Sequence, residues 1–362
     1  MRKTRAAMLL LAIVLTMGAS RPTILPTSLP RARPPPFYGD LSVMTYNIHG
    51  LPWPVAWGRA AELARIASRL RALREAGRNP HIVALQEAFT QEAQSIGRTA
   101  GYHYVVTGPS AVTTGAIMAS GSDSDLARNP SWLKGEGIGK YVGSGLQILS
   151  DYPITGIRRM TFPAFACGGY DCLANKGALL ASIKLPDRPD PIDIVTTHLN
   201  SRHASKVSDD RSLEAYRIQL ALLTDFIHKA HDPARALIVA GDFNVGNARA
   251  RRAILLGDIR SGWSSSGTPV RNAYDSAVRA GLPISADAVF SRRRARDWQF
   301  YASVAVTGVD LTGIDVPFGH AADGSMLSDH IGYTVRFRLS RRSVPATSFA
   351  RSTATATGAA PA

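Results

Sequence analysis

Residues 237–244 read LIVAGDFN, an apolar run followed at once by polar residues. The four apolar residues Leu237 to Ala240 are typical of a buried β-strand. Asp242 and Asn244 follow one residue apart, so in an extended chain both side chains project to the same side. This pattern favours a polar site where the strand leaves the core, although GDFN taken alone is also compatible with a simple turn.

The same arrangement occurs twice along the chain. A β-rich run at 192–197 and a helical pattern at 209–230 precede the LIVA strand, and an earlier copy consists of a strand at 42–48, a helix at 59–76 and a strand at 82–85. Polar residues end these strands: Asn47 and His49, Gln86 and Glu87, His198 and Asn200, and Asp242 with Asn244. Apolar strands that release such side chains at one end build a site along one edge of a sheet.

Further β-rich runs fill the rest of the chain, at 146–149, 178–183, 286–290, 300–306 and 331–337. Because strands and helices of this kind must bury one face each, we predict an α/β (α+β) fold. The expected architecture is a four-layer sandwich, in which two mixed β-sheets pack face to face and helices cover the outside.

Composition and charge limit the class of protein. The 362 residues are 45% hydrophobic and 19% charged, which suits a sizeable core and argues against disorder or a multi-pass membrane protein. The net charge is +15, but residues 1–36 and 341–362 carry nine arginines and lysines and no acid. The remaining excess suits a phosphate-bearing substrate, and it does not choose between nucleic acid and a lipid headgroup.

The two ends of the chain have compositions of their own. MRKTR, an apolar run at 6–17 and small residues at 18–20 have the pattern of an export signal, with an uncleaved anchor as the alternative. We therefore expect a signal peptide at 1–20, a Pro/Arg-rich linker at 21–37, one catalytic domain at 38–340 and a disordered tail at 341–362. The expected location is secreted or periplasmic.

Cys167 and Cys172 are the chain's two cysteines, and they flank a Gly-Gly turn. Their closeness favours a small-loop disulfide in an oxidising compartment, with two unpaired thiols as the alternative. Two thiols cannot form a structural zinc site by themselves.

Two more places carry polar residues next to apolar strands. Glu87 emerges after the run IVAL, where its carboxylate can bind a hard divalent cation, although a glutamate at a strand end is more often solvated or ion-paired. Asp329 and His330 precede the strand IGYTVRF, and an aspartate beside a histidine can support a base that takes a proton from water.

Six short motifs occur in the order TYNIHG, VALQE, THLNS, AGDFN, ADAVF and SDH, each near the end of a predicted strand. In order and spacing they resemble the endonuclease/exonuclease/phosphatase (DNase I-like) superfamily over about residues 38 to 340. The resemblance implies a metal-dependent phosphoric diester hydrolase that uses Mg²⁺, or Mn²⁺ or another divalent cation in its place.

The resemblance also implies a role for each matching residue. Asn47 and Glu87 hold or place the metal, and Asp329 is a further acid of the metal or phosphate site. His198 and Asn244 contact the scissile phosphate, while Asp242 and His330 activate or orient the attacking water. Asp287, in ADAVF, matches the acid that pairs with the final histidine. The sequence does not decide whether Asp242 or His330 takes the proton.

Within the superfamily, three features are similar to secreted sphingomyelinase-like phospholipases C: NIHGLPWP after the first strand, Asn175-Lys176-Gly177, and THL with His198. Lys176 and Asn200 are the candidate phosphate-binding residues, with a solvated turn lysine as the alternative for Lys176. We therefore expect an exported monomer that hydrolyses sphingomyelin or a related phospholipid at a membrane surface. The alternatives are an extracellular nuclease acting on nucleic acid, a small-molecule phosphatase and a non-catalytic binding module.

A lipid substrate requires a surface that meets the bilayer. The candidate segments are Trp53 with Trp57, the loop at 120–141 with Trp132, and the segment at 292–320 with Trp298, Phe300 and Phe318. The alternation of Trp298 and Phe300 favours a core strand for that stretch instead.

Overall fold

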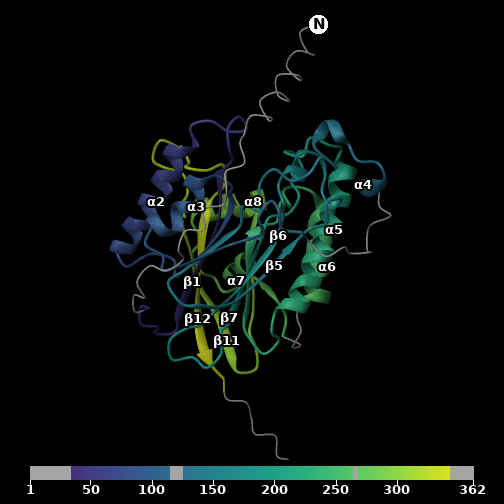
Figure 1. Cartoon of the computed structure of the whole chain (residues 1–362). Helices are drawn as coiled ribbons and strands as arrows, with labels where there is room; N and C mark the ends of the chain where they lie inside the picture. The colour runs from purple at the N-terminus through teal and green to yellow at the C-terminus, as the bar shows by residue number, and fades with distance from the viewer. Residues whose placement is uncertain (1–33, 115–124, 264–267, 343–362) are drawn as a thin grey trace, which may run out of the picture. The chain divides into compact units, whose positions relative to one another are not determined.

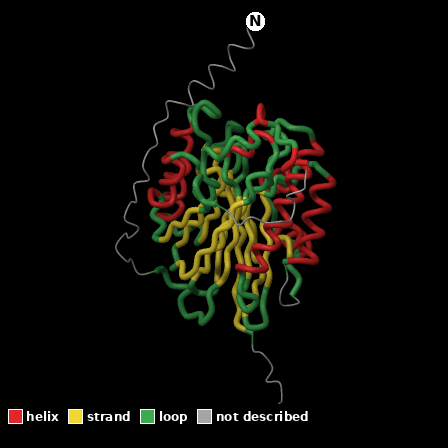
Figure 2. Tube along the Cα trace, turned by 45° about the vertical axis from the view of Figure 1, so that its right-hand side comes forward, coloured by secondary structure: helices red, strands yellow, loops and turns green. Residues whose placement is uncertain are grey.

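The computed structural model describes residues 34–114, 125–263 and 268–342. Two six-stranded sheets form the centre of this part of the chain, and helices lie outside them (Figures 1 and 2). The first sheet has the strand order β11-β12-β1-β2-β4-β3, and the second has the order β5-β6-β7-β8-β10-β9. Both sheets mix parallel and antiparallel neighbours, as the sequence predicted.

The strands of the first sheet are β1 (Asp40–Gly50), β2 (Ile82–Ala88), β3 (Tyr104–Thr107), β4 (Gln147–Ser150), β11 (Thr307–Phe318) and β12 (Gly332–Arg341). Those of the second are β5 (Ile154–Thr161), β6 (Gly177–Ile183), β7 (Ile192–Thr197), β8 (Leu237–Asp242), β9 (Arg271–Asn272) and β10 (Asp297–Ala302). The helices are α2 (Arg59–Glu75), α3 (Gln91–Thr99), α4 (Asp125–Arg128), α5 (Asp209–Ala230), α6 (Arg249–Gly262), α7 (Ala273–Arg279) and α8 (Ala286–Arg294). Two 3₁₀ turns, η1 (Trp132–Lys134) and η2 (Gly169–Leu173), complete the set.

The repeated strand-helix-strand unit is present in both halves. β1 and β2 are parallel neighbours joined through α2, and β7 and β8 are parallel neighbours joined through α5. Helix α5 begins after Ser208, whose side chain accepts a hydrogen bond from the backbone amide of Arg211. Leu220 and Leu223 on this helix are fully buried. Parallel pairing brings the carboxyl ends of all four strands to the same side of their sheets.

Apolar side chains fill three layers of core. One cluster combines residues of both sheets, including Val43, Ile148, Ile194 and Val335, and therefore lies between them. A second cluster joins the second sheet to α5 and α6, and a third joins the first sheet to α2 and α3. The predicted four-layer sandwich is confirmed.

The segment at 286–290 was predicted as a strand, and this prediction is wrong. It forms the start of α8, because Ser285 caps the helix by accepting a hydrogen bond from Ala288 and Asp287 lies in the first turn. The strand lies further on, in β10, where Trp298 and Phe300 are buried in the core cluster. Phe318 is buried as well, so these three aromatic residues are not available to a bilayer.

No helix among the described residues is long and apolar enough to cross a membrane. The expected signal peptide and most of the expected linker and tail lie outside the described residues. Phe37, at the end of the expected linker, packs against the core and meets Tyr152 edge to face.

Candidate active site

Three strands reach the site with an unusual backbone at their ends. His49, Glu87 and Asn244 have φ values of 51°, 58° and 48°, in the left-handed region that residues other than glycine rarely adopt. Each lies where a strand of the parallel pairs leaves the core. Such conformations cost energy and persist where the surrounding structure holds them, which is frequent at functional sites.

Asn47 connects the two sheets at this edge. Its Nδ2 lies 2.9 Å from Glu87 Oε1 and 3.0 Å from Asp242 Oδ2, so one amide group bonds carboxylates from both sheets. The backbone amide of His49 donates to Asn47 Oδ1 at 3.0 Å. Because Oδ1 is occupied, the orientation of the amide is fixed with its donors toward the two carboxylates.

His198 follows β7 and lies beside the same carboxylates. Its Nε2 is 3.5 Å from Asp242 Oδ2 and 3.9 Å from Glu87 Oε1. Lys176, just before β6, places Nζ 3.2 Å from this ring nitrogen and 2.9 Å from Asp171 Oδ2. Lys176 is buried, so it is not a solvated turn lysine.

His330 is held between two buried aspartates. Its Nδ1 lies 2.8 Å and 3.0 Å from the two carboxylate oxygens of Asp297, and its Nε2 lies 3.7 Å from Asp242 Oδ2. Asp287, the residue expected to pair with this histidine, instead bonds Nδ1 of His320 at 2.5 Å. The expected partner was wrong because 286–290 is helical, and the acid that pairs with His330 is the first residue of β10.

Asp329 lies at the mouth of the site, with its side chain 52% exposed. Arg296 Nη1 is 3.2 Å from Asp329 Oδ2 and 3.3 Å from His330 Nε2, while His49 Nδ1 is 3.9 Å from the other oxygen of Asp329. Arg294 donates to the backbone carbonyl of Asp329. Two guanidinium groups therefore surround the acid that precedes His330.

Asn244 and Asn200 occupy different positions from one another. Asn244 is half-buried beside Asp242, and its Nδ2 donates to the carbonyl of Leu199 at 3.0 Å. Asn200 is fully buried, with Oδ1 accepting from the Gly168 amide and Nδ2 donating to the carbonyl of Ser201, both at 2.9 Å. Its polar atoms are thus already used within the chain, which makes it a brace of the loop and not a group facing the mouth.

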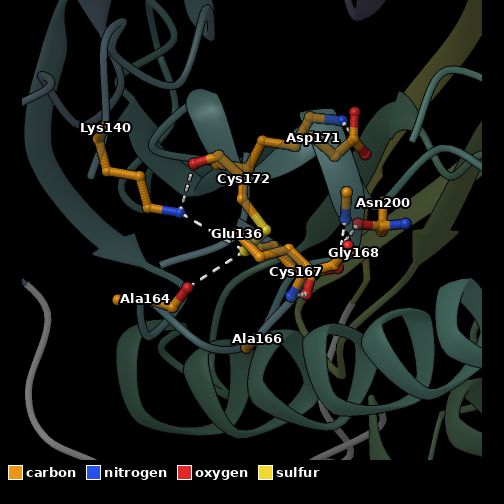
Figure 3. The surroundings of a disulfide bond; sticks show 12 residues. Glu136, Lys140, Ala164, Ala166, Cys167, Gly168, Asp171, Cys172 and Asn200 are labelled. Atoms are coloured by element: carbon orange, nitrogen blue, oxygen red, sulfur yellow. Dashed lines mark hydrogen bonds and ion pairs between the residues drawn. A yellow bond between two sulfur atoms is a disulfide. The ribbon is translucent and has the colours of Figure 1, made fainter. Parts of the chain in front are cut away.

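A disulfide joins Cys167 and Cys172, which confirms the predicted pairing (Figure 3). The loop between them carries Asp171, whose Oδ2 bonds both Lys176 Nζ and the backbone amide of Ser201. The loop is also held from outside, because Lys140 Nζ donates to the carbonyl of Cys172 at 2.9 Å. The covalent ring therefore fixes an acid that orients the buried lysine.

Burial decides the protonation of two of these groups. It raises the pKa of Glu87 to about 7, although the hydrogen bond from Asn47 opposes the rise. It also lowers the pKa of His198 to about 4, and the charge of Lys176 acts in the same direction. At neutral pH the imidazole of His198 is neutral.

Ion pairing sets the pKa of Asp242 and the pKa of His330. Burial raises the pKa of Asp242, but the neighbouring His330 and His198 outweigh it and lower the pKa to about 2. Burial lowers the pKa of His330, and the carboxylates of Asp297 and Asp242 outweigh it and raise the pKa to about 9. A line of charges, Asp297 to His330 to Asp242, therefore runs through the buried side of the site.

The donor set fits a hard divalent cation. Glu87 Oε2 is buried and has no hydrogen-bond partner among the described residues, which is costly for a carboxylate unless a cation or proton compensates it. Carboxylate and amide oxygens are the ligands that Mg²⁺ prefers. Asp242, Asp297 and His330 also place one ligand atom each within 4.8 Å of one another, but His330 Nδ1 is already bonded to Asp297. Glu87 is therefore the better candidate to hold a cation, with Asp242 beside it, and Asn47 would help to place the metal by orienting both carboxylates.

Four residues of this region were not found from the sequence: Asp171, Arg251, Arg296 and Asp297. Arg251 is almost fully buried and donates to the carbonyls of Asn200 and Asn244, at 2.6 Å and 2.8 Å, so it supports both site loops. Asp297 directly precedes the apolar run of β10, as Asp329 and His330 precede β12. A search for acids in front of strands, and not only behind them, would have found it.

Known proteins share this fold. A sphingomyelinase of Mycobacterium bovis is 27% identical over 220 residues, which cover 60% of this chain and 36% of the relative. The chain thus matches about a third of the length of that curated relative. Sphingomyelinase C from Streptomyces griseocarneus has a TM-score of 0.53 at 19% identity, covering 82% of this chain and 99% of that one.

Two further solved structures differ in what they contain. A mutant beta toxin from Staphylococcus aureus with bound magnesium ions has a TM-score of 0.53 at 17% identity, covering 82% of this chain and 99% of that one. TDP2 from D. rerio, complexed with a single-strand DNA product, has a TM-score of 0.51 at 15% identity, covering 82% and 98%. At these identities the likenesses show the fold. The model of the Endonuclease/Exonuclease/phosphatase family matches residues 44–330, and the chain therefore belongs to that family.

Proposed function

We propose that this protein is a metal-dependent phosphodiesterase that hydrolyses sphingomyelin or a related phospholipid in the manner of a phospholipase C. The observation that carries the hydrolase is the meeting of Asn47, Glu87, His198, Asp242, Asp297 and His330 at one edge of two sheets. Phosphodiester hydrolysis requires a base for water and positive groups for the phosphate oxygens. This cluster supplies both.

The base is assigned to the deprotonated form of His330, which the pKa of about 9 makes a minority at neutral pH and the main form above pH 9. Asp297 bonds Nδ1 and fixes the ring, so Nε2 is the atom that exchanges a proton with water, between Asp242 Oδ2 at 3.7 Å and Arg296 Nη1 at 3.3 Å. Asp242, with a pKa of about 2, is a weak base and serves better to orient the water and balance the imidazolium charge.

The phosphate oxygens are expected to face the opposite group of side chains. Lys176 Nζ donates to Asp171, His198 and Leu199, so it acts on the phosphate through its charge and through the neutral ring of His198. Asn244 extends this group with its side-chain amide. The guanidinium group of Arg296 adds a second positive charge, at the mouth of the site. A divalent cation such as Mg²⁺, bound by Glu87 and placed with the help of Asn47, would neutralise charge on the phosphate.

Two exposed apolar segments support a lipid substrate. Trp57 is 75% exposed in the loop that follows β1, and Trp53 packs against it edge to face at 5.9 Å. Leu133 is 96% exposed beside the exposed Trp132, in a loop whose Glu136 bonds the disulfide loop through Gly169. Both segments connect directly to loops of the site. Exposed aromatic and aliphatic side chains of this kind insert into the interfacial region of bilayers.

The first experiment measures release of phosphorylcholine from sphingomyelin vesicles by the full chain, with Mg²⁺ and with a chelator. Plasmid cleavage is measured under the same conditions, because the fold also occurs in the TDP2 complex with DNA and the chain is basic. We expect Mg²⁺-dependent release and intact plasmid. His330→Ala is the control that shows whether release belongs to this site. Cut plasmid without lipid hydrolysis would assign the protein to the nucleases instead.

The proposal also includes that the protein is exported, that it is a monomer and that its ion is Mg²⁺. An oxidised disulfide in the loop beside Lys176 supports a protein that acts outside the cytosol. Metal preference is tested by replacing Mg²⁺ with Mn²⁺ or Ca²⁺ in the vesicle assay, and the oligomeric state by sedimentation.

A further inference from the structure

The regular pairing of the first sheet is interrupted at the end of β1. This strand pairs with β12 only as far as Thr45, and its register on β2 shifts after Asn47. The carbonyls of Ile48 and His49 lie in the irregular stretch, and His49 has the left-handed backbone described above. Backbone carbonyls that are partly shielded from water need hydrogen-bond donors, and here both accept from a side chain outside the sheet.

Arg59, the first residue of α2, is this donor. Its Nε lies 2.7 Å from the carbonyl oxygen of His49, and its Nη2 lies 2.9 Å from that of Ile48. The same Nη2 is 2.8 Å from the carbonyl oxygen of Leu327, in the loop that leads to His330. The side chain of Arg59 is only 13% exposed. One guanidinium group therefore joins the end of β1 to the loop of the proposed base.

A buried serine makes a second connection between the same two segments. Ser328 Oγ donates to the carbonyl of Asn47 at 2.7 Å and accepts the backbone amide of His330 at 3.3 Å. A hydroxyl group has one proton, which rotates to suit its acceptor, whereas a guanidinium group holds its donors in a fixed plane. Arg59 therefore supplies a rigid connection where Ser328 alone would supply an adaptable one.

The two joined segments carry groups that must act together. Asn47 orients the carboxylates of Glu87 and Asp242, and His330 provides the Nε2 atom that exchanges a proton with water. Both side chains approach Asp242 Oδ2, with Asn47 Nδ2 at 3.0 Å and His330 Nε2 at 3.7 Å. A shift of one segment relative to the other would therefore change the place where the water is activated.

The second sheet has a comparable arrangement. Arg251, in the first turn of α6, donates to the carbonyls of Asn200 and Asn244, which follow β7 and β8. In each half of the molecule, an arginine from the first turn of a helix thus bonds the backbone of two segments of the site.

We propose that Arg59 is a positioning residue of the reaction, which holds the segment of His330 in place relative to the carboxylates that Asn47 orients. It acts through backbone carbonyls and does not touch the substrate. Arg59→Lys keeps the positive charge but loses the planar set of donors. A displacement of about 1 Å in a catalytic group costs roughly a hundredfold in rate, so we expect kcat to fall by about that factor. KM should change by less than about threefold, because the groups that bind the phosphate stay in place.

The matched control is Arg65→Lys, since Arg65 is exposed on the same helix. Both variants of the full chain are assayed for kcat and KM on sphingomyelin vesicles with Mg²⁺. Chemical rescue separates positioning from a general loss of stability. Arg59→Ala is assayed with millimolar guanidinium chloride and, separately, with the same concentration of sodium chloride. We expect guanidinium to raise kcat about tenfold and sodium to leave it unchanged, because only guanidinium restores the planar donors.

Hydrogen–deuterium exchange of the full chain gives a readout that needs no turnover. The kinetic part of the proposal rests on the lipid hydrolysis proposed above, whereas the exchange rates do not. In Arg59→Lys, the backbone amides at 47–50 and at 327–331 should both exchange faster than in the wild type, and in Arg65→Lys they should match it. If the wild type releases no phosphorylcholine, the lipid hydrolysis is refuted, and the exchange rates still decide whether Arg59 joins the two segments.

Unchanged exchange in both segments overturns the proposal. Faster exchange at 47–50 alone overturns it as well, because Arg59 would then hold only the end of β1. The same holds for a kcat in Arg59→Lys that equals that of the wild type, or for a folded Arg59→Ala whose kcat guanidinium does not raise. Where Arg59→Ala fails to fold, the kinetics and the exchange rates of Arg59→Lys decide.

Discussion

Replacement of Asp297 by Asn tests the assignment of the acid that the sequence missed. Both oxygens of Asp297 lie within hydrogen-bond distance of His330 Nδ1, and both side chains are 5% exposed. The variant keeps the shape but removes the charge that holds the ring and stabilises its protonated form. A correctly held general base contributes about 10²- to 10⁴-fold to the rate, so we expect kcat/KM to fall by about that factor.

The matched control is Asp287→Asn. This acid was expected from its motif to pair with the final histidine, but it bonds His320, which is itself partly exposed. Its replacement should change kcat/KM by less than about threefold, as a surface substitution of small energetic effect. Equal losses in the two variants, or a larger loss in the control, would refute the pairing of Asp297 with His330.

The pH profile gives an independent readout of the same pair. The pKa of His330 is raised to about 9, chiefly by Asp297 and Asp242 against the effect of burial. Its contribution to stability is present below the unfolded pKa of about 6.5 and is lost as the pH rises through 9. Asp297→Asn removes the larger of the two favourable charges. The part of the pH–rate profile that reports the titration of His330 should therefore move to lower pH. A limb that does not move would mean that another group titrates.

Three further predictions concern other parts of the chain. Glu87→Ala should abolish metal-stimulated turnover in the vesicle assay and leave the circular dichroism spectrum unchanged; stimulation that persists would remove Glu87 as a ligand. Cys167→Ser with Cys172→Ser should lower the free energy of unfolding in urea by about 2 kcal/mol, the value for so short a loop, and an unchanged midpoint would refute this. Asp193 is fully buried, bonds Ser182 and His231, and has a lowered pKa. Asp193→Asn should destabilise the fold by about 3 kcal/mol at neutral pH, and the difference from wild type should shrink as the pH falls below about 4, where the wild type loses the same contribution.

The sequence predicted the layers of the fold well, because they follow from local patterns. Helix α5 was expected at 209–230 and has those bounds, since a serine cap and an apolar face mark it clearly. The paired strand-helix-strand units were found for the same reason. The run ADAVF failed because five residues of mixed polarity fit a short strand as well as a capped first turn, and only Ser285 in front of it distinguishes the two.

The residues of the candidate site were predicted where a carboxylate, an amide or an imidazole side chain lies at the end of a strand. Five of the predicted residues lie at the ends of buried strands or next to them: Asn47, Glu87, His198, Asp242 and His330. The structure brings them together, because Asn47 bonds both Glu87 and Asp242 and both histidines lie within 3.7 Å of Asp242. The supporting residues could not be found in this way, because their roles depend on pairing across the sheets. Asp297 faces Asp242 through the register of β10 on β8, and no local pattern encodes that register.

The first and last described strands of the chain are neighbours, since β1 pairs with β12 along six residues beginning with Asp40 and Arg338. His330 lies two residues before β12, so a growing chain cannot complete either the sheet or the cluster until its carboxyl-terminal part has been made. Pairing across such a long separation also slows folding. A chain that emerges amino terminus first therefore acquires its complete cluster only when its last strand takes its place in the sheet.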